Sequence, residues 1–149
     1  MARAGAPLPP ITSFRGDYAF LSNFHPSPFL VGELLAPTAE HAVQMLKTDV
    51  EEERKWVCEA PTPALAKRRG RKVTLRPDWL GVRQEVMEKV LRLKFAPRSE
   101  LPAVLLTTGD AELIEGNNWN DRFWGVCRGI GSNHLGKLLM RVRANLATR

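Results

Sequence analysis

The chain is poor in cysteine and histidine, and this excludes several classes of site. Cys58 and Cys127 are its only cysteines and show no CxxC spacing, so neither a disulfide framework nor a structural zinc site is expected. The three histidines, His25, His41 and His134, show no HExxH or other paired spacing, which argues against metal catalysis. A GxSxG nucleophile motif is also absent. We therefore expect no metal and no cofactor.

Long apolar runs are lacking as well. No stretch approaches the roughly 18 apolar residues that a membrane span needs. The N-terminal residues contain no apolar segment after a basic start, so no secretory signal is visible. We expect a cytoplasmic protein without a membrane partner, and the sequence leaves its oligomeric state open.

The composition fits one globular domain. The chain has 149 residues, of which 44% are apolar and 26% charged, and a chain of this length buries roughly two-thirds of its unfolded surface. Residues 1–12 are rich in Ala, Pro and Gly and are expected to form a loose tail. Residues 13–149 are expected to form a single, mostly helical α+β domain with a few short strands.

Local patterns predict where the elements lie. Short strands and turns are expected from Phe14 to Phe29, and a hairpin at 29–31 and 34–35. Helices are expected at 38–47, 49–59, 62–70, 78–95 and 101–106, followed by a closing helix from 133, and residues 112–115 suggest a further strand. The expected helix N-caps are Thr38, Asp49, Thr62 and Asn133, and Gly70 is the expected helix end. The closing helix is expected to bury Leu135, Leu138, Leu139, Val142 and Leu146.

The helix that starts at Thr38 carries the first candidate site. Its period places Glu40, Gln44 and Lys47 on one face. These polar groups lie on an otherwise apolar helix and cost desolvation free energy if that helix is buried. The pattern fits either a surface helix with a polar stripe or a set of catalytic groups held on a rigid element.

Two further features involve basic residues. Lys94 and Arg83 fall inside the apolar arc of the helix at 78–95, where Leu93 is also expected. Lys94 there either extends to solvent, forms an ion pair or meets a ligand. The net charge is +6, and Lys67 to Arg76 contains six Lys or Arg residues. That run fits a phosphate in a small ligand or in nucleic acid, or a solvated basic loop.

Two loops near the C-terminus could bind a ligand. Residues 115–125 combine acids, amides and two tryptophans. Turn chemistry accounts for the Asn, Asp and Gly residues. A planar base could stack on Trp124 while Asp121 or Glu115 bonds a sugar, or both tryptophans could pack in the core. Residues 128–133 place glycines before a helix, where free N–H groups could bind a phosphate, although the pattern is weak by itself.

Several of these residues, in this order, carry a resemblance to a known family. The blocks are Leu21–Phe24, Pro37–His41 with Gln44 and Lys47, residues 66–71, Trp79, Lys94 with Phe95, residues 105–113 before Glu115, Asp121 with Trp124 and Gly125, Asn133–Gly136 and Leu138–Met140. Over residues 14–143 the chain resembles the NADAR superfamily, which includes the YbiA-like N-glycosidases.

The resemblance implies a fold, an activity and a set of site residues. It implies a compact, mostly helical α+β fold. It also implies an enzyme that cleaves the C1–N bond of a phosphorylated riboside. The substrate would be an early riboflavin-pathway intermediate, releasing ribose 5-phosphate, or ADP-ribosyl-guanine in DNA. The implied catalytic residues are Glu40, Lys47 and Asp121. The implied substrate-binding residues are Asn23, Gln44, Trp79, Lys94, Glu115, Trp124, Gly125 and Asn133. A non-catalytic module that binds ADP-ribose or NAD is the alternative.

Chemistry suggests a role for each catalytic group. Glu40 would stabilise positive charge that develops on the ribose, and Glu40 or Asp121 would activate water. Lys47, with Lys94 as the second choice, would form a Schiff base with the opened sugar. The chain departs from the family pattern at Ala42 and Val43, where aromatics are usual, and at Val126–Arg128, where glycine is usual. These differences favour an ADP-ribosyl substrate.

Overall fold

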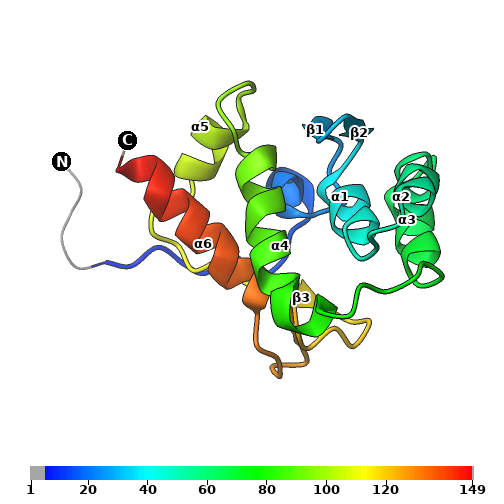
Figure 1. The fold of residues 1–149 in the computed structure, drawn as a ribbon. Helices are drawn as coiled ribbons and strands as arrows, with labels where there is room; N and C mark the ends of the chain where they lie inside the picture. Colours follow the sequence, from blue (N-terminus) through cyan, green and yellow to red (C-terminus); the bar gives the residue numbers. More distant parts are fainter. Residues whose placement is uncertain (1–5, 149) are drawn as a thin grey trace. The chain divides into compact units, whose positions relative to one another are not determined.

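The computed structural model describes residues 6–148, which fold into two compact units (Figure 1). Unit 2 is Asn23–Lys94, and unit 1 combines the chain up to Ser22 with the chain from Phe95 onwards. Unit 2 contains β1 (Phe29–Val31), β2 (Leu34–Ala36), α1 (Ala39–Met45), α2 (Glu51–Cys58), α3 (Pro63–Gly70) and α4 (Trp79–Lys94). Unit 1 contains the 3₁₀ helix η1 (Gly16–Leu21), α5 (Leu101–Leu106), β3 (Gly116–Asn117), β4 (Val126–Cys127) and α6 (His134–Ala147).

The element content confirms the prediction of a mostly helical α+β fold with a few short strands. The predicted domain boundary at residue 13 stays a prediction. No helix within residues 6–148 is both long enough and apolar enough to cross a membrane.

Unit 2 is built around α1, which packs against α2, α3 and α4 (Figure 1). Its buried apolar residues include Ala39, Ala42 and Val43, whose small side chains let neighbouring helices approach closely. The predicted cap is confirmed, because the Thr38 hydroxyl accepts a hydrogen bond from the His41 N–H at 3.2 Å. The helix ends at Met45, two residues earlier than predicted.

Helices α2 and α3 differ in how far local sequence predicts their ends. Thr62 caps α3 as predicted, since its side chain accepts from the Leu65 N–H at 3.1 Å. The predicted Asp49 cap of α2 is wrong: the N-cap is Val50, and its N–H is bonded by the Thr48 hydroxyl at 3.1 Å. The Asp49 carboxylate instead lies 3.6 Å from the Arg54 guanidinium. The side chain that was predicted to cap the helix therefore forms an ion pair.

The hairpin and the long helix were predicted closely. Strands β1 and β2 pair antiparallel, with Phe29 opposite Ala36. Helix α4 begins one residue later and ends one residue earlier than predicted. Lys94 is buried within the apolar arc, but Leu93 is 37% exposed, so its assignment to that arc was wrong. Leu93 follows the exposed Arg92 and lies at the margin of the stripe, where one residue step of about 100° decides burial.

The segment before the hairpin was predicted incorrectly. Residues 16–21 form the 3₁₀ helix η1 instead of strands. Only the adjacent residues Phe20 and Leu21 of η1 are buried, and a helical turn buries two neighbours on one side more readily than a strand, which alternates its faces.

In unit 1 the segment before η1 pairs with the segment after α5. The Ile11 N–H donates to the Glu112 carbonyl at 2.8 Å, and the Ile114 N–H donates to the Ile11 carbonyl at 2.8 Å. The predicted strand at 112–115 is therefore a single parallel bridge at Leu113, and the regular pairing is between β3 and β4. Of the predicted tail, residues 1–5 lie outside the described part, whereas Ile11 is only 8% exposed.

Helix α6 packs against α5 and buries most of the residues that its pattern predicted (Figure 1). Leu135, Leu138, Leu139 and Val142 are buried, whereas Leu146 is half-buried. Asn133 is the N-cap residue of α6 as predicted, but its side chain makes no cap bond and its φ is 53°. Its amide instead donates to the Leu113 carbonyl at 2.9 Å and accepts from the Glu115 N–H at 3.0 Å.

Candidate functional site

The polar face of α1 holds a fixed carboxylate. The Gln44 Nε2 donates a 2.6 Å hydrogen bond to Glu40 Oε2, and the Glu40 N–H donates to the Asn23 carbonyl at 2.9 Å. Gln44 is only 6% exposed, while Glu40 and Lys47 are half-buried. A solvated surface stripe is therefore the wrong description of this face, because its central amide is buried and directed at the carboxylate.

Lys47 lies one turn beyond Gln44 and interacts electrostatically with Glu40. Burial lowers the pKa of the Lys47 ammonium, the Glu40 carboxylate raises that pKa, and the cations of Arg71 and Lys67 lower it further. The result is a pKa below the ordinary value of 10.5. A larger share of Lys47 is therefore the neutral, nucleophilic amine than in a solvated lysine.

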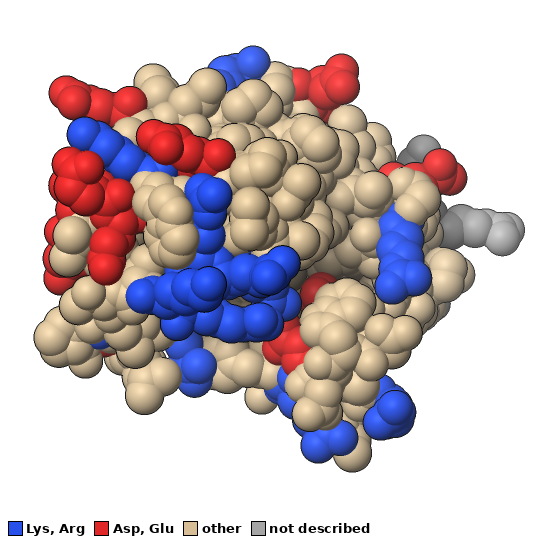
Figure 2. All heavy atoms as spheres, turned by 90° about the vertical axis from the view of Figure 1, so that its right-hand side faces the viewer, with Lys and Arg blue, Asp and Glu red and all other residues tan. Residues whose placement is uncertain are grey.

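The basic run around α3 serves more than one purpose. Figure 2 shows Lys and Arg side chains gathered on one face of the molecule. Arg69 is used structurally: its Nη1 donates to the Trp56 carbonyl at 2.6 Å and its guanidinium lies 5.1 Å from the centre of the Trp56 ring. Lys67 and Arg71 instead act on Lys47. The run is thus neither a uniform phosphate site nor simply a solvated loop.

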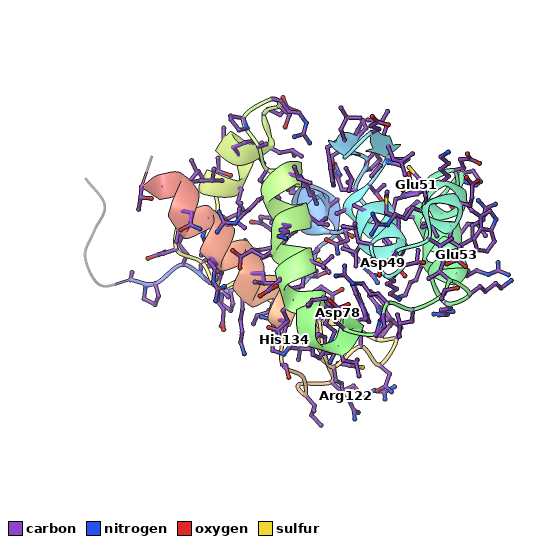
Figure 3. All side chains as sticks on the ribbon, viewed as in Figure 1. Asp49, Glu51, Glu53, Asp78, Arg122 and His134 are labelled. Carbon is purple, nitrogen blue, oxygen red and sulfur yellow. The ribbon has the colours of Figure 1, made fainter. Side chains whose placement is uncertain are left out.

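The segment after α3 returns to the C-terminal end of α1 and fixes the backbone of Lys47. The Arg76 N–H donates to the Lys47 carbonyl at 2.8 Å. Glu53 of α2 holds the same segment, since it accepts from the Thr74 N–H at 2.8 Å, the Thr74 hydroxyl at 3.0 Å and the Thr48 hydroxyl at 2.7 Å. In Figure 3, Glu53 is labelled on α2 and Asp78 at the start of α4, between which this segment runs.

We expect Glu53→Gln to reduce stability in a pH-dependent way. The bonds from Thr48 and Thr74 lower the pKa of Glu53, so the ionised carboxylate stabilises the folded state above the unfolded pKa of about 4.3. Urea unfolding should give a smaller free energy for the variant at pH 7, and the difference should shrink as the pH falls through the lowered folded pKa. Glu51→Gln, in the same first turn of α2, controls for the helix dipole. Equal stability of Glu53→Gln and wild type at pH 7 would contradict this.

Asn23 and Lys94 are buried polar residues of unit 2. Asn23 is 8% exposed, its Nδ2 lies 3.4 Å from the Met87 sulfur, and its Oδ1 has no hydrogen-bond partner among the residues described. Lys94 is fully buried, and burial lowers its pKa to about 7. The hypothesis that Lys94 extends to solvent is therefore wrong. Trp79, the remaining predicted residue of this unit, is 7% exposed at the first position of α4.

His41 is a structural residue whose role sequence reasoning missed. Its Nε2 lies 2.8 Å from the Ala60 carbonyl and its Nδ1 lies 2.8 Å from the Thr38 hydroxyl. Because a carbonyl only accepts, Nε2 carries the proton and Nδ1 accepts from Thr38. Burial lowers the pKa of His41, although the bond to Ala60 opposes this. The neutral ring thus ties the start of α1, where Glu40 lies, to the residues before α3.

In unit 1 the structure brings Glu115 and Asp121 together through Asn117. The Asn117 Nδ2 donates to Glu115 Oε2 at 3.2 Å and to the Asp121 carbonyl at 2.9 Å, and its Oδ1 accepts from the Asp121 N–H at 3.0 Å. Sequence reasoning treated Asn117 only as a turn residue. Its spacing of four from Asp121 in an amide-rich loop was the available signal.

The same loop fixes Trp124 and Gly125. Asp121 Oδ1 accepts from the Trp124 N–H at 2.9 Å and the Phe123 N–H at 3.2 Å. Trp124 is half-buried and packs edge-on against Phe123, with ring centres 4.7 Å apart. Trp119 is 50% exposed, so core packing of both tryptophans is wrong. A Cβ on Gly125 would overlap Glu115 Oε2, which explains the glycine.

The glycine loop before α6 does not offer a phosphate site. The N–H groups of residues 132–135 donate to the carbonyls of residues 122–125, at distances between 2.8 and 3.2 Å. These are the donors that a phosphate would need at the start of the helix. The phosphate prediction for this loop is therefore wrong, because the Trp124 loop already occupies its amides.

The predicted site residues thus divide between the two units. Unit 2 carries Asn23, Glu40, Gln44, Lys47, Trp79 and Lys94, and unit 1 carries Glu115, Asp121, Trp124, Gly125 and Asn133. Within residues 6–148, no three His, Cys, Asp or Glu side chains are grouped so that they could hold a metal ion.

Comparison with known proteins supports a specific family. The NADAR domain model matches residues 13–147. The chain is 41% identical to N-glycosidase YbiA of Escherichia coli over 134 residues, covering 88% of this chain and 83% of that protein. It is 36% identical to N-glycosidase Npun_R5314 of Nostoc punctiforme, covering 87% and 86%. It is also 38% identical to riboflavin biosynthesis protein VVA0006 of Vibrio vulnificus, covering 87% of this chain and 36% of that protein.

A solved structure agrees with the sequence matches. The solution structure of E. coli YbiA superimposes with a TM-score of 0.81 at 40% identity, covering 93% of this chain and 83% of that one. Both the family model and the relatives extend over nearly the whole chain. The chain therefore belongs to the NADAR family.

Proposed function

We propose that the protein is an N-glycosidase that hydrolyses the C1–N bond between a phosphorylated ribose and a base. The observation that carries this proposal is the pair of Glu40 on α1 and Lys47 just after it. Glu40 is held by Gln44, and it interacts electrostatically with Lys47, whose pKa is lowered. Two of the relatives compared above are named N-glycosidases, and the α1 residues supply the chemistry that this reaction needs.

Glu40 is the proposed catalytic carboxylate. When the C1–N bond breaks, the base leaves with the bonding electrons and positive charge develops on the ribose. A carboxylate held in place by Gln44 stabilises that charge without reorganising. Water then forms the new C1–O bond, and Glu40 accepts its proton as the general base.

Lys47 is the proposed nucleophile where the substrate is a ribosylamine. Ring opening of such a sugar gives an imine at C1. The neutral Lys47 amine adds to that carbon, and the base leaves as its amine, so that a lysine imine of the sugar remains. Water hydrolyses this imine to the free aldehyde sugar and regenerates Lys47. The lowered pKa of Lys47 supports this role, since the protonated ammonium cannot attack.

Unit 1 carries candidate ligand-binding residues of its own. Asp121 Oδ1 accepts two backbone N–H bonds of residues 123 and 124, which favours positioning of Trp124 over activation of water. Half-buried Trp124 offers a ring on which a planar base can stack. Glu115, held by Asn117, is the proposed partner of a sugar hydroxyl.

Two substrates of this class are proposed for testing. A ribosylamine phosphate of the riboflavin pathway is favoured by the name of the Vibrio relative. ADP-ribosyl-guanine in DNA is favoured by the exposed cations Arg68, Arg71 and Lys72, which suit a polyanion. In both cases Lys67 and Arg71, the cations that act on Lys47, are the proposed phosphate ligands, because the amides before α6 are already bonded.

The test is turnover of each substrate by the purified protein. We expect release of free base and sugar phosphate in equal amounts from one of them, and slower release from the same substrate after its phosphate is removed. An enzyme-free reaction controls for spontaneous hydrolysis of the ribosylamine. Tight binding of ADP-ribose or NAD without release from any substrate would instead identify a non-catalytic binding module.

A further inference from the structure

Gly70 lies where α3 touches the polar face of α1. It is the last residue of α3 and is buried. A Cβ built at this position would overlap Gln44 Oε1 and would lie 2.8 Å from its Cδ and 3.0 Å from its Cβ. Any side chain at residue 70 would therefore displace the Gln44 amide.

Conformational freedom does not explain this glycine. Gly70 is not among the residues with positive φ, and glycine disfavours a helix relative to alanine. The sequence predicts Gly70 as the end of its helix, and it is the last residue of α3. The close approach to Gln44 is the reason why this residue is a glycine.

The amide that Gly70 touches is the one that holds Glu40. Gln44 Nε2 donates to Glu40 Oε2 at 2.6 Å, whereas Oε1 is buried without a hydrogen-bond partner among the residues described. Rotating the amide by 180° would place Oε1 against the carboxylate and remove that bond. The amide therefore has one favourable orientation, with its oxygen against Gly70 and its nitrogen toward Glu40.

We infer that Gly70 is a positioning residue, which sets the place of the Glu40 carboxylate through the Gln44 amide. The inference rests on the proposed function, in which Glu40 is the reacting carboxylate. The bare Cα of Gly70 gives the Gln44 side chain room to stay within reach of Glu40. A residue that acts on the reacting carboxylate only through the Gln44 amide then controls the alignment of the catalytic group.

Gly70→Ala tests this inference, with Gly81→Ala as its matched control. Gly81 is also a helical glycine of unit 2, but a Cβ there would meet no atom within 4 Å. We expect Gly70→Ala to lower kcat on the order of 10- to 100-fold with KM changed less than about twofold, and Gly81→Ala to leave both unchanged. An equal loss in the two variants would overturn the inference.

The Gln44→Ala background separates positioning from a general effect on folding. Once Gln44→Ala removes the amide, the overlaps with Oε1 and Cδ are gone and only the 3.0 Å approach to the Cβ of residue 44 remains. Gly70→Ala should then fold and lower kcat no further than Gln44→Ala alone. A second full loss of kcat in this background would show that Gly70 acts independently of Gln44, and would overturn the inference.

A spectroscopic measurement keeps the inference distinct from the proposed function. The side-chain NH₂ signals of Gln44 in an ¹H–¹⁵N spectrum, assigned with Glu40→Gln and Gln44→Ala, report its bond to the carboxylate. They should shift in Gly70→Ala and stay in place in Gly81→Ala. If the wild type turns over no substrate, the proposed function fails, yet a shift still supports the coupling from Gly70 to Glu40. Unchanged Gln44 signals in Gly70→Ala would refute it.

Discussion

Replacing Glu40 with glutamine should lower kcat at least about 100-fold, the usual scale for a positioned acid–base group. The amide is isosteric but carries no negative charge, so it neither stabilises the developing charge on the ribose nor accepts a proton from water. Its oxygen can still accept from Gln44 Nε2, which lies 2.6 Å from Oε2 in the wild type. The fold and KM should therefore change little, and steady-state kinetics should show a loss confined to kcat.

Glu51→Gln is the control for this substitution. Glu51 is an exposed residue of α2, labelled in Figure 3, and also belongs to unit 2. The Glu51→Gln substitution removes one negative charge, as Glu40→Gln does, but leaves Glu40, Gln44 and Lys47 unchanged. It should therefore leave kcat unchanged. Near-normal turnover of Glu40→Gln would remove Glu40 from the mechanism.

Lys47→Ala should abolish the covalent sugar adduct that borohydride traps in the wild type. Reduction converts a lysine imine into a stable secondary amine, so intact-mass spectrometry shows the added sugar phosphate. Burial, together with Arg71 and Lys67, lowers the pKa of Lys47. Because the neutral amine forms as the pH rises, the rate of trapping should increase with pH, with its midpoint below the ordinary lysine pKa of 10.5.

Lys94→Met separates the two candidate lysines. Lys94 is fully buried and its pKa is lowered to about 7, so it too is neutral in part at physiological pH. Methionine keeps most of its volume without the amine. The adduct should persist in Lys94→Met. Trapping that survives in Lys47→Ala and disappears in Lys94→Met would reverse the assignment.

Local chemistry predicted the elements that carry the α1 face. Thr38 and Thr62 cap their helices because a hydroxyl and the N–H three residues later belong to one turn. The alignment of Glu40 with Gln44 follows from the helix period alone. Residues three or four apart on a helix are neighbours on its surface, and this holds independently of the rest of the chain.

Two predictions failed because other residues bond the groups that the local pattern leaves available. Asp49 fits an N-cap by sequence, but Arg54 occupies its carboxylate. The N–H groups of residues 132–135 fit a phosphate site, but the carbonyls of residues 122–125 accept from them. Asp49 is bonded by a residue of the helix that it was predicted to cap, whereas the N–H groups of residues 132–135 are bonded by a separate segment whose approach the local pattern does not encode.

The sequence left two contacts of unit 2 undecided. The apolar arc of α4 left open whether Lys94 extends to solvent, forms an ion pair or meets a ligand, and the structure shows that it is fully buried. Gly70 was predicted to end α3, and it does. Only the structure shows that its contact is with Gln44 of another helix, which no spacing within α3 could reveal.

The central claim is that this chain hydrolyses a C1–N bond with Glu40 as the carboxylate. The most direct measurement is a quenched time course that follows free base and sugar phosphate together, with wild type, Glu40→Gln and no enzyme, on the ribosylamine phosphate and on ADP-ribosyl-guanine DNA. We predict many turnovers per molecule of wild type on one substrate, with the two products in equal amounts, and at least about 100-fold slower release by Glu40→Gln. Binding of both substrates by the wild type, with release no faster than without enzyme, would contradict the claim.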